Sequence, residues 1–217
     1  MQQGKKYWCS ADTKEEMANE TPQQQIILLG DGGSGNNNSN APVETIDNSI
    51  MFYGNVDGPN AKLFNKAVRT LDTDLQMFGV RYRATPPPIR VHISSDGGSL
   101  LDGFSMMDTI VNSVTPVHTY IDGHAASAAT LISVVADKRF MFKNSRLLIH
   151  QLSSAVWGKF EDIVEEVENL DSFMKQIKKI YKEHTKISAK DLNEILKKDR
   201  WFSAEECLKM GIIDEII

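Results

Sequence analysis

From Ser49 onward, the chain alternates between two spacings of hydrophobic residues. Short apolar runs bounded by turn residues predict strands, at 50–56, 89–95, 116–121, 139–142 and 146–150. Apolar residues spaced three or four apart predict helices between them, at 60–78, 99–113 and within 123–140. Repeated strand–helix units of this kind are typical of an α/β domain.

The longest predicted helix covers 158–185. Its apolar residues lie alternately three and four apart, at Phe160, Ile163, Val167, Leu170, Met174, Ile177 and Tyr181. At about 1.5 Å per residue, roughly 25 residues would span almost 40 Å. We therefore expect the helix to project from the domain and to need a partner for its apolar seam. The alternative is that the seam packs along its own domain.

Residues 1–49 have a different composition. The segment is mostly polar, with a short apolar run at 26–29 and a Gly/Asn-rich stretch after it, and we interpret it as an N-terminal arm with one short strand. The glycines at 30–35 resemble a phosphate-binding loop, but no Gly-Lys-Ser/Thr follows them. A flexible loop is the better interpretation of these glycines.

The C-terminal region carries clear helix boundaries. Ser188 with Asp191 and Ser203 with Glu206 have the spacing of helix-start capping residues. Gly211 follows where a helix C-cap glycine belongs. The last six residues, IIDEII, predict a closing strand.

Composition restricts the classes of partner. The net charge is -5, from 24 Lys and Arg against 29 Asp and Glu, which argues against a nucleic-acid partner. The apolar run at 131–136 is far shorter than the roughly 20 residues of a membrane span. Cys9 and Cys207 lie far apart and no apolar leader follows the N-terminal lysines, so we expect a cytoplasmic protein without a membrane partner.

One serine stands among small residues in GHAASAAT at 123–130. A hydroxyl at a helix start, as expected for Ser127, can act as a nucleophile because unpaired backbone N–H groups there stabilise a developing negative charge. The flanking alanines leave room for a substrate backbone, and Gly123 allows a sharp entry turn. The alternative is that Ser127 only caps its helix.

A serine nucleophile needs a base and a third group that orients the base. Among the five histidines, His150 ends the apolar strand RLLIH, so its imidazole is expected at the edge of the sheet. His124 is close to the serine in sequence but is expected to point away from it. The other three are weaker candidates, namely His92, His118 and His184.

The oxyanion donor and the acid are less sharply defined by the residues. Gly97 and Gly98 in SSDGGS, between a predicted strand and helix, allow a backbone N–H to turn inward. Asp199 in KKDRWFSAEE lies at a helix-to-loop boundary beside two aromatic residues. The residue pattern does not separate Asp199 from Asp96 or Asp191 as the acid.

Four segments together resemble the ClpP family, the proteolytic subunits of the Clp protease. SSDGG, GHAASA, NSRLLIHQ and KKDRWFSAEECLKMGIID are similar, in the same order, to the family's glycine, nucleophile, base and acid segments. The resemblance covers about residues 50–217. It implies an α/β fold, a crotonase-like spiral of strand–helix units with a protruding handle helix, and a serine endopeptidase that works by a Ser-His-Asp mechanism.

Matched position by position, the resemblance implies a role for five residues. Ser127 would be the nucleophile, His150 the general base and Asp199 the acid that orients the base. Gly98 and Ala128 would supply the two backbone N–H groups of the oxyanion hole. The family implies no metal and no cofactor.

The resemblance also implies how the protein assembles. The handle is expected at about 151–184, interdigitating with an opposite ring, and Leu152, Ser153 and Ser154 would bind an extended peptide by strand addition. The family forms a homo-oligomer of two stacked heptameric rings around a closed chamber. An AAA+ unfoldase of the ClpX, ClpA or ClpC type usually supplies unfolded protein substrates.

Several positions depart from the family's usual pattern. Ala128 stands where Met is usual, and Asp96 stands where typical bacterial members have Pro. Lys197 and Lys198 replace a common acidic–basic pair. In the strand that helps to form the family's docking groove for the unfoldase, Arg90 and His92 occupy positions that are usually aromatic. These differences fit a divergent or phage-encoded member. An acyl-CoA enzyme of the crotonase class and an inactive ring scaffold subunit are the alternatives, and covalent labelling of Ser127 separates them from a protease.

Overall fold

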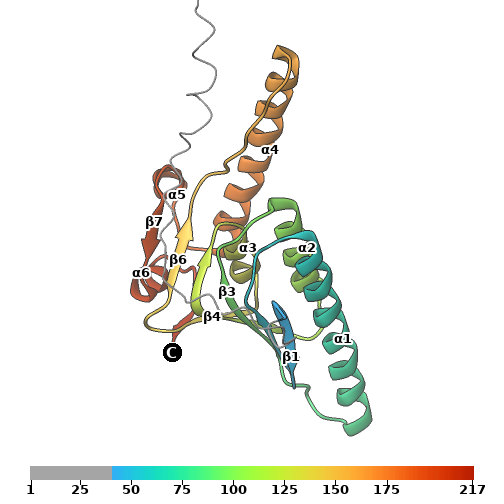
Figure 1. The fold of residues 1–217 in the computed structure, drawn as a ribbon. Coiled ribbons are helices and arrows are strands. Elements are labelled where there is room, and N and C mark those ends of the chain that lie inside the picture. Colours follow the sequence, from blue (N-terminus) through green and yellow to red (C-terminus); the bar gives the residue numbers. More distant parts are fainter. Residues whose placement is uncertain (1–40) are drawn as a thin grey trace, which may run out of the picture. The chain divides into compact units, whose positions relative to one another are not determined.

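The computed structural model describes residues 41–217 (Figure 1). Most of the predicted arm, including the expected strand at 26–29 and the glycines at 30–35, lies outside the described residues. The described part is a mixed α/β unit built on one eight-stranded sheet. Six strands follow the order β1-β2-β3-β4-β5-β8, while β6 pairs with β4 and β7.

The elements alternate along the chain, as the hydrophobic pattern predicts. The strands are β1 (Val43–Ile46), β2 (Ser49–Phe52), β3 (Ile89–Ser95), β4 (Val117–Ala126), β5 (Lys138–Met141), β6 (Arg146–Ile149), β7 (Arg200–Phe202) and β8 (Glu215–Ile216). The helices are α1 (Gly58–Tyr82), α2 (Leu100–Val111), α3 (Ala128–Val134), α4 (Phe160–His184), α5 (Ala189–Leu196) and α6 (Ala204–Lys209). Strand β1, which pairs antiparallel with β2, was not predicted from the hydrophobic pattern.

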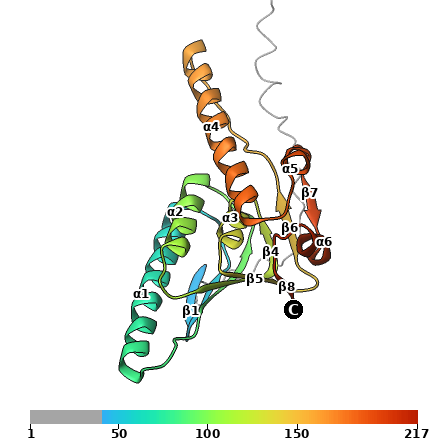
Figure 2. The same ribbon diagram turned by 180° about the vertical axis from the view of Figure 1, so that it is seen from behind.

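Strands β2, β3, β4 and β5 are parallel neighbours, and a helix connects each to the next. Helices α1, α2 and α3 lie together on one face of the sheet, as Figure 2 shows from behind. In β3, Ile89, Val91 and Ile93 are buried, whereas the residues between them are not. This alternation is what a sheet with one covered face requires. The predicted α/β fold is confirmed.

Strand β4 is long enough to pair with two successive strands on the same side. Its first half, through Ile121, pairs with β5, and its last residues, His124 to Ala126, pair with β6. The predicted strands at 139–142 and 146–150 therefore follow each other along β4. The Ser145 hydroxyl lies at the step between them and donates to the carbonyls of Ile121 (2.9 Å) and Asp122 (2.8 Å).

The helix expected within 123–140 is shorter than predicted. Strand β4 continues through Ala126, because this segment pairs with β3 on one side and β6 on the other. The sharp turn lies at Ser127 and not at Gly123, and α3 begins at Ala128. Sheet pairing has overridden the helical preference of the alanines.

The seam of α4 divides into two parts. Near its C-terminal end, Ile177 and Tyr181 are buried in the chain's own core. Towards the other end, Phe160 is 75% exposed and Val167 is 58% exposed. Both expectations for this helix therefore hold in part: half of the seam packs on the domain and half is uncovered. None of the described helices is long and apolar enough to cross a membrane.

The predicted caps near the C-terminus are confirmed. Ser188 accepts from the backbone N–H of Asp191 at the start of α5, and Ser203 forms a capping box with Glu206 at the start of α6. Gly211 has a φ of 65°, the left-handed conformation expected after a helix. These caps fix α5, β7 and α6 beside β6, where β7 pairs with that strand.

Arg139 ties the C-terminal segment to the sheet and to α4. Its Nε donates to Asp214 Oδ2 (3.0 Å), its Nη2 donates to Asp214 Oδ1 (2.6 Å), and its Nη1 donates to the carbonyl of His184 (2.5 Å). The hydrogen bond from Arg139 lowers the pKa of Asp214 below its usual range, against the opposing effect of partial burial.

We expect Asp214→Asn to lower the free energy of unfolding at neutral pH by about 1 kcal/mol, since the pair is partly exposed. A depressed pKa in the folded state gives stability that is present above the unfolded-state pKa and is lost as the pH falls through the folded-state value. The difference between wild type and variant should therefore shrink below about pH 4. Urea denaturation at several pH values measures it.

Asp171→Asn is the matched control. Its carboxylate pairs with Lys175 at 2.7 Å, but both side chains are well exposed on α4. Such a pair contributes little to stability, so this variant should unfold like the wild type at every pH. A stability difference for Asp214→Asn that stays constant down to about pH 3 would contradict the role given to its ionised form.

Candidate functional site

Three of the predicted site segments meet at one edge of the sheet. Gly97 and Gly98 follow β3, Ser127 follows β4, and His150 follows β6. Because β3 and β6 are both parallel neighbours of β4, these strands end on the same side. The carboxyl edge of parallel strands is where α/β folds commonly place ligand sites.

Ser127 lies on a strained turn between β4 and α3. Its backbone has φ 53° and ψ -126°, a combination that a residue with a Cβ adopts only when its surroundings hold it there. Its N–H donates to the carbonyl of Leu148 (3.0 Å) in β6. The side chain makes no capping hydrogen bond. The structure therefore does not support the alternative in which Ser127 merely caps its helix.

A cavity of about 260 Å³ opens beside Ser127. Its polar lining includes Gly98, Ser127, His150 and Ser153. Its apolar lining comes from Leu100, Ala128, Leu131, Leu152, Ile177 and Tyr181. The cavity thus combines a hydroxyl, an imidazole and an apolar wall, which is the composition of a site for a side chain next to a reacting group.

The glycine loop after β3 lies against the serine turn. A Cβ added to Gly97 would lie 2.5 Å from the carbonyl oxygen of Ala126 and 2.8 Å from the Cβ of Ser127, so only glycine allows this approach. Gly97 and Gly98 both have positive φ. Within residues 41–217, the N–H groups of Gly98 and Ala128 have no hydrogen-bond acceptor. Two unpaired donors therefore flank the hydroxyl.

His150 and Asp199 face each other across two antiparallel strands. The register pairs Ile149 with Arg200, so the residues after β6 and before β7 are opposite each other. The Nδ1 of His150 lies 3.9 Å from Oδ1 of Asp199, an ion-pair distance that is longer than a hydrogen bond. The Asp199 side chain is 84% exposed and that of His150 is 25% exposed. Catalytic hydrogen bonds are often long in the absence of substrate.

Other histidines have carboxylate partners of their own. His92 Nδ1 lies 3.0 Å from both carboxylate oxygens of Asp122, and His124 Nε2 lies 3.0 Å from Oδ1 of Asp96. Of the histidines in the described part, however, only His150 lines the cavity with Ser127. Geometry therefore favours His150 among the bases that the sequence offered.

A cysteine nucleophile has no comparable environment in the described region. Cys207 is fully buried, and burial raises the pKa of its thiol to about 12, so it is protonated at neutral pH. Residues 41–217 also contain no group of three or more His, Cys, Asp or Glu side chains that could hold a metal ion. The hydroxyl of Ser127 and the imidazole of His150 both line the cavity.

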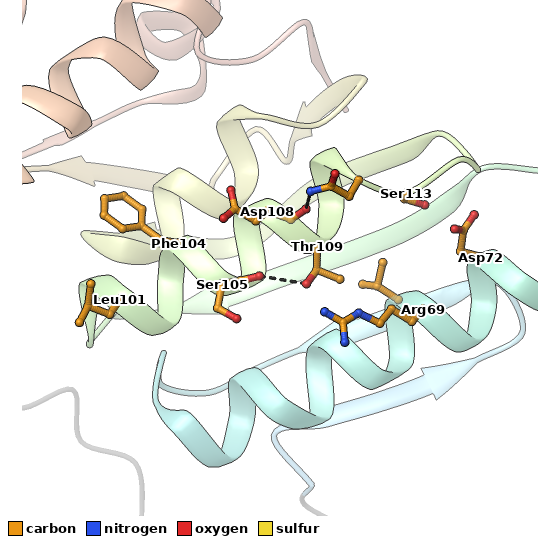
Figure 3. A pocket seen from close by; sticks show the side chains of 10 residues that line it. Arg69, Asp72, Leu101, Phe104, Ser105, Asp108, Thr109 and Ser113 are labelled. Atoms are coloured by element: carbon orange, nitrogen blue, oxygen red, sulfur yellow. Dashed lines mark hydrogen bonds between the residues drawn. The ribbon is translucent and has the colours of Figure 1, made fainter.

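A larger hollow, of about 580 Å³, lies between α1 and α2 (Figure 3). Its charged residues include Asp72, whose carboxylate accepts from the backbone N–H groups of Thr115 (2.7 Å) and Val114 (3.3 Å). Partial burial alone would raise the pKa of Asp72, but these hydrogen bonds outweigh it and lower the pKa. Asp72 therefore holds the loop before β4, and no histidine lines the hollow to activate one of its hydroxyl groups.

The segment expected to bind substrate runs alongside α4 (Figure 1). Leu152 N–H lies 3.4 Å from Met174 Sδ, and Ser154 Oγ donates to Glu166 Oε1 (2.8 Å). No strand is assigned between residues 151 and 157. Among the described residues, the backbone groups of 153–157 have no backbone hydrogen-bond partner, so they are available to an extended peptide.

Sequence reasoning missed part of the cavity wall and the network behind it. Tyr181, predicted only as a seam residue of a projecting helix, lines the cavity, and its hydroxyl forms a buried hydrogen bond with the hydroxyl of Thr130. Thr130 also donates to the carbonyl of Ser127 (2.6 Å). The available signal was Thr130, a polar residue in the otherwise apolar stretch 128–132.

Comparisons with known proteins show the family of this chain. A family model described as Clp protease matches residues 50–217. The chain is 37% identical to ATP-dependent Clp protease proteolytic subunit 1 of Streptomyces avermitilis and 35% identical to proteolytic subunit 3 of Streptomyces coelicolor, in each case over 131 residues, 59% of this chain. The matches span 60% of the length of each of these relatives.

A solved structure shows the same fold. A ClpP1 mutant from Listeria monocytogenes superposes with a TM-score of 0.67 at 26% sequence identity. The superposition covers 78% of this chain and 91% of that chain. The likeness therefore extends over nearly the whole length of the Listeria chain.

Proposed function

Because the chain belongs to the Clp protease family, we propose that it is a serine peptidase subunit that hydrolyses peptide bonds at Ser127. The observation that supports the proposal is the cavity, which is lined by Ser127, His150, Gly98 and Ala128. The backbone N–H groups of Gly98 and Ala128 have no acceptor among residues 41–217.

In the proposed reaction, Oγ of Ser127 attacks the carbonyl carbon of the scissile peptide bond while Nε2 of His150 takes the hydroxyl proton. Asp199, on the Nδ1 side of the ring, holds the imidazole and stabilises its charged form. His150 then gives the proton to the leaving amine as the C–N bond breaks. Water hydrolyses the resulting ester and regenerates Ser127.

The oxyanion that forms in the first step needs donors that are already in position. We assign this role to the N–H groups of Gly98 and Ala128, which lack acceptors in the described part of the chain. The N–H of Ala128 also begins α3, so the partial positive charge of a helix start adds to the stabilisation. No metal or cofactor takes part in these steps.

The substrate class follows from the cavity and its neighbouring segment. An extended peptide would add its backbone to residues Leu152, Ser153 and Ser154. Among residues 41–217, only the N–H of Leu152 has a hydrogen-bond partner in this stretch of main chain. The side chain before the scissile bond would enter the apolar cavity between α3 and α4. We expect apolar side chains to be preferred there, because the lining offers no buried charge to pair with a charged one.

Assembly forms the second part of the proposal. Trp157 is fully exposed, and Phe160, Ile163 and Val167 add further exposed apolar area at the same end of α4. Exposed apolar clusters of this kind mark contact surfaces. We propose that another copy of the chain covers this end of α4 in an assembly of two stacked heptameric rings. An AAA+ unfoldase in the cytoplasm would supply this assembly with unfolded protein.

One experiment tests the chemistry and the assembly together. The purified chain is incubated with a fluorophosphonate, the adduct is located by peptide mass spectrometry, and the intact particle is weighed by native mass spectrometry. We expect a single adduct on Ser127 and a mass corresponding to a double ring. His150→Ala should abolish labelling without changing the number of subunits in the particle, because it removes only the base.

The alternatives predict different results. A crotonase-type acyl-CoA enzyme needs no activated serine, so it would remain unlabelled and would act on a thioester. An inactive scaffold subunit would assemble and remain unlabelled. Absence of an adduct on Ser127 in the assembled particle would therefore overturn the proposed peptidase.

A further inference from the structure

The conformation of Ser127 has to be maintained by its neighbours. Among the residues described, Asp47, Arg83 and Ser127 are the non-glycine residues with positive φ. Arg83 has the ordinary left-handed conformation, with ψ 41°, whereas ψ of Ser127 is -126°. Backbone conformations of this kind are strained and persist only where surrounding contacts over-determine them.

The carbonyl of Ser127 is held from one side by Thr130. It accepts from the Thr130 N–H at 3.0 Å and from the Thr130 hydroxyl at 2.6 Å. Because the Thr130 proton is committed to this carbonyl, the oxygen of Thr130 is left to accept a hydrogen bond, and Tyr181 lies within reach. The order of donation is therefore Tyr181 to Thr130 to the Ser127 carbonyl.

Both members of this pair are removed from water. Thr130 is 1% exposed and Tyr181 is 2% exposed, and the two residues come from different helices, α3 and α4. Complete burial raises the pKa of the Tyr181 hydroxyl well above its usual value, so the hydroxyl keeps its proton. Hydrogen bonds in such dry surroundings are strong and polarise one another.

We propose that Tyr181 and Thr130 are positioning residues for the reaction proposed at Ser127, because they fix the peptide unit that joins Ser127 to Ala128. In a trans peptide the C=O and the following N–H lie in one plane and point in opposite directions. Two hydrogen bonds on the Ser127 carbonyl therefore also set the direction of the Ala128 N–H, which is one of the two oxyanion donors. Tyr181 acts only through Thr130.

The inference rests on the proposed function and predicts a specific kinetic signature. Thr130→Val keeps the shape of the side chain but removes the hydroxyl. We expect kcat for a fluorogenic peptide to fall by roughly 10- to 100-fold, less than the 10²–10³-fold of a missing oxyanion donor, because the donor is misdirected and not deleted. KM should change little, since the oxyanion exists only in the transition state.

A conservative variant and a mutant cycle separate positioning from packing. Thr130→Ser keeps the hydroxyl and should restore most of kcat. Tyr181→Phe keeps the ring in the cavity wall and removes only the hydroxyl, so kcat should fall by about fivefold, the effect of one hydrogen bond. The double variant should be no slower than Thr130→Val alone, because Tyr181 has no route to the peptide other than Thr130.

A structural readout decides the inference independently of activity. Crystal structures should show the Ser127–Ala128 peptide rotated in Thr130→Val and unchanged in Thr130→Ser. If the peptide keeps its orientation in Thr130→Val, or if kcat is unchanged in both Thr130→Val and Tyr181→Phe, the inference is wrong. Additive losses in the double variant would contradict the relay from Tyr181.

These outcomes differ from failure of the proposed peptidase. If the wild type neither reacts with a fluorophosphonate nor cleaves any peptide, the proposed function fails, but the rotation of the peptide in Thr130→Val still decides the inference. If Thr130→Val does not fold, Tyr181→Phe with its intact ring provides the same comparison of kcat and peptide orientation.

Discussion

Ser127→Ala should reduce peptide hydrolysis to background while the particle assembles normally. Removing the nucleophile of a serine peptidase typically lowers kcat by a factor on the order of 10⁶. The fold should tolerate the change, because the Ser127 side chain makes no capping hydrogen bond and alanine carries the same Cβ at this strained turn. Turnover of a small fluorogenic peptide measures hydrolysis. The unfolding midpoint measures the stability of the fold, and the native mass measures assembly.

Ser172→Ala is the matched control, since Ser172 is exposed on α4 and lies outside the cavity. It should leave turnover and labelling at the level of the wild type. Residual activity near the wild-type level in Ser127→Ala would exclude Ser127 as the nucleophile. Loss of activity together with loss of assembly would instead assign Ser127 a structural role and remove the support that this variant gives to the chemistry.

The convergence of the site could be predicted from the sequence because it depends on the order of elements. Parallel strands linked by helices end at one edge of a sheet, so segments that follow successive strands come together. Gly98 and Ser127 follow β3 and β4, two such strands that α2 connects, whereas His150 follows β6, which a short turn joins to β5. His150 was favoured because it ends a predicted strand, and the complete set of site residues came from the family resemblance.

The acid could not be chosen from the residue pattern because its position depends on pairing between distant segments. Asp199 lies opposite His150 through the antiparallel register of β6 and β7. The other two candidates have different partners: Asp96 pairs with His124, and Asp191 accepts from the Ser188 hydroxyl. The Ser188–Asp191 pair is local and shows in the sequence as capping spacing, but the pairings of Asp199 with His150 and of Asp96 with His124 join distant segments and leave no mark there. The choice of Asp199 came from the family resemblance.

The same limit explains the errors around α3 and α4. The segment before Ser127 was interpreted as the entry turn of a helix, with the sharp turn at Gly123, yet pairing with β3 and β6 extends it as a strand. The seam of α4 was correctly predicted as one apolar stripe, but the burial of Tyr181 and its bond to Thr130 depend on a neighbour 51 residues away. Hydrophobic periodicity predicts which face of a helix is apolar, but it does not predict which element packs against that face.

Gly98→Ala should nearly abolish activity without touching the nucleophile. Gly98 has a φ of 144°, and an added Cβ would lie 2.3 Å from the carbonyl oxygen of Val56. That carbonyl is fixed, because it accepts from Ser99 N–H (2.7 Å) while the N–H of Val56 donates to Gly97 (2.8 Å). The loop must therefore move, and with it the N–H of Gly98.

The expected loss in kcat is about 10²–10³-fold, the usual effect of losing one oxyanion donor. The free energy of unfolding should fall as well, by more than about 1 kcal/mol, because alanine is strained at this φ. Peptide turnover and urea denaturation measure the two effects. Labelling by a fluorophosphonate should become slower but still occur at Ser127, since the base and the hydroxyl remain.

Gly58→Ala provides the control for the substitution itself. Gly58 begins α1, and the nearest atom to an added Cβ there is Oδ1 of Asp102 at 3.9 Å, an ordinary contact. This variant should be as active as the wild type and at least as stable, because alanine favours a helix more than glycine does. If Gly98→Ala were as active as the wild type, the backbone N–H of Gly98 could not be an oxyanion donor. The proposed oxyanion hole would then retain only one of its two donors, the N–H of Ala128.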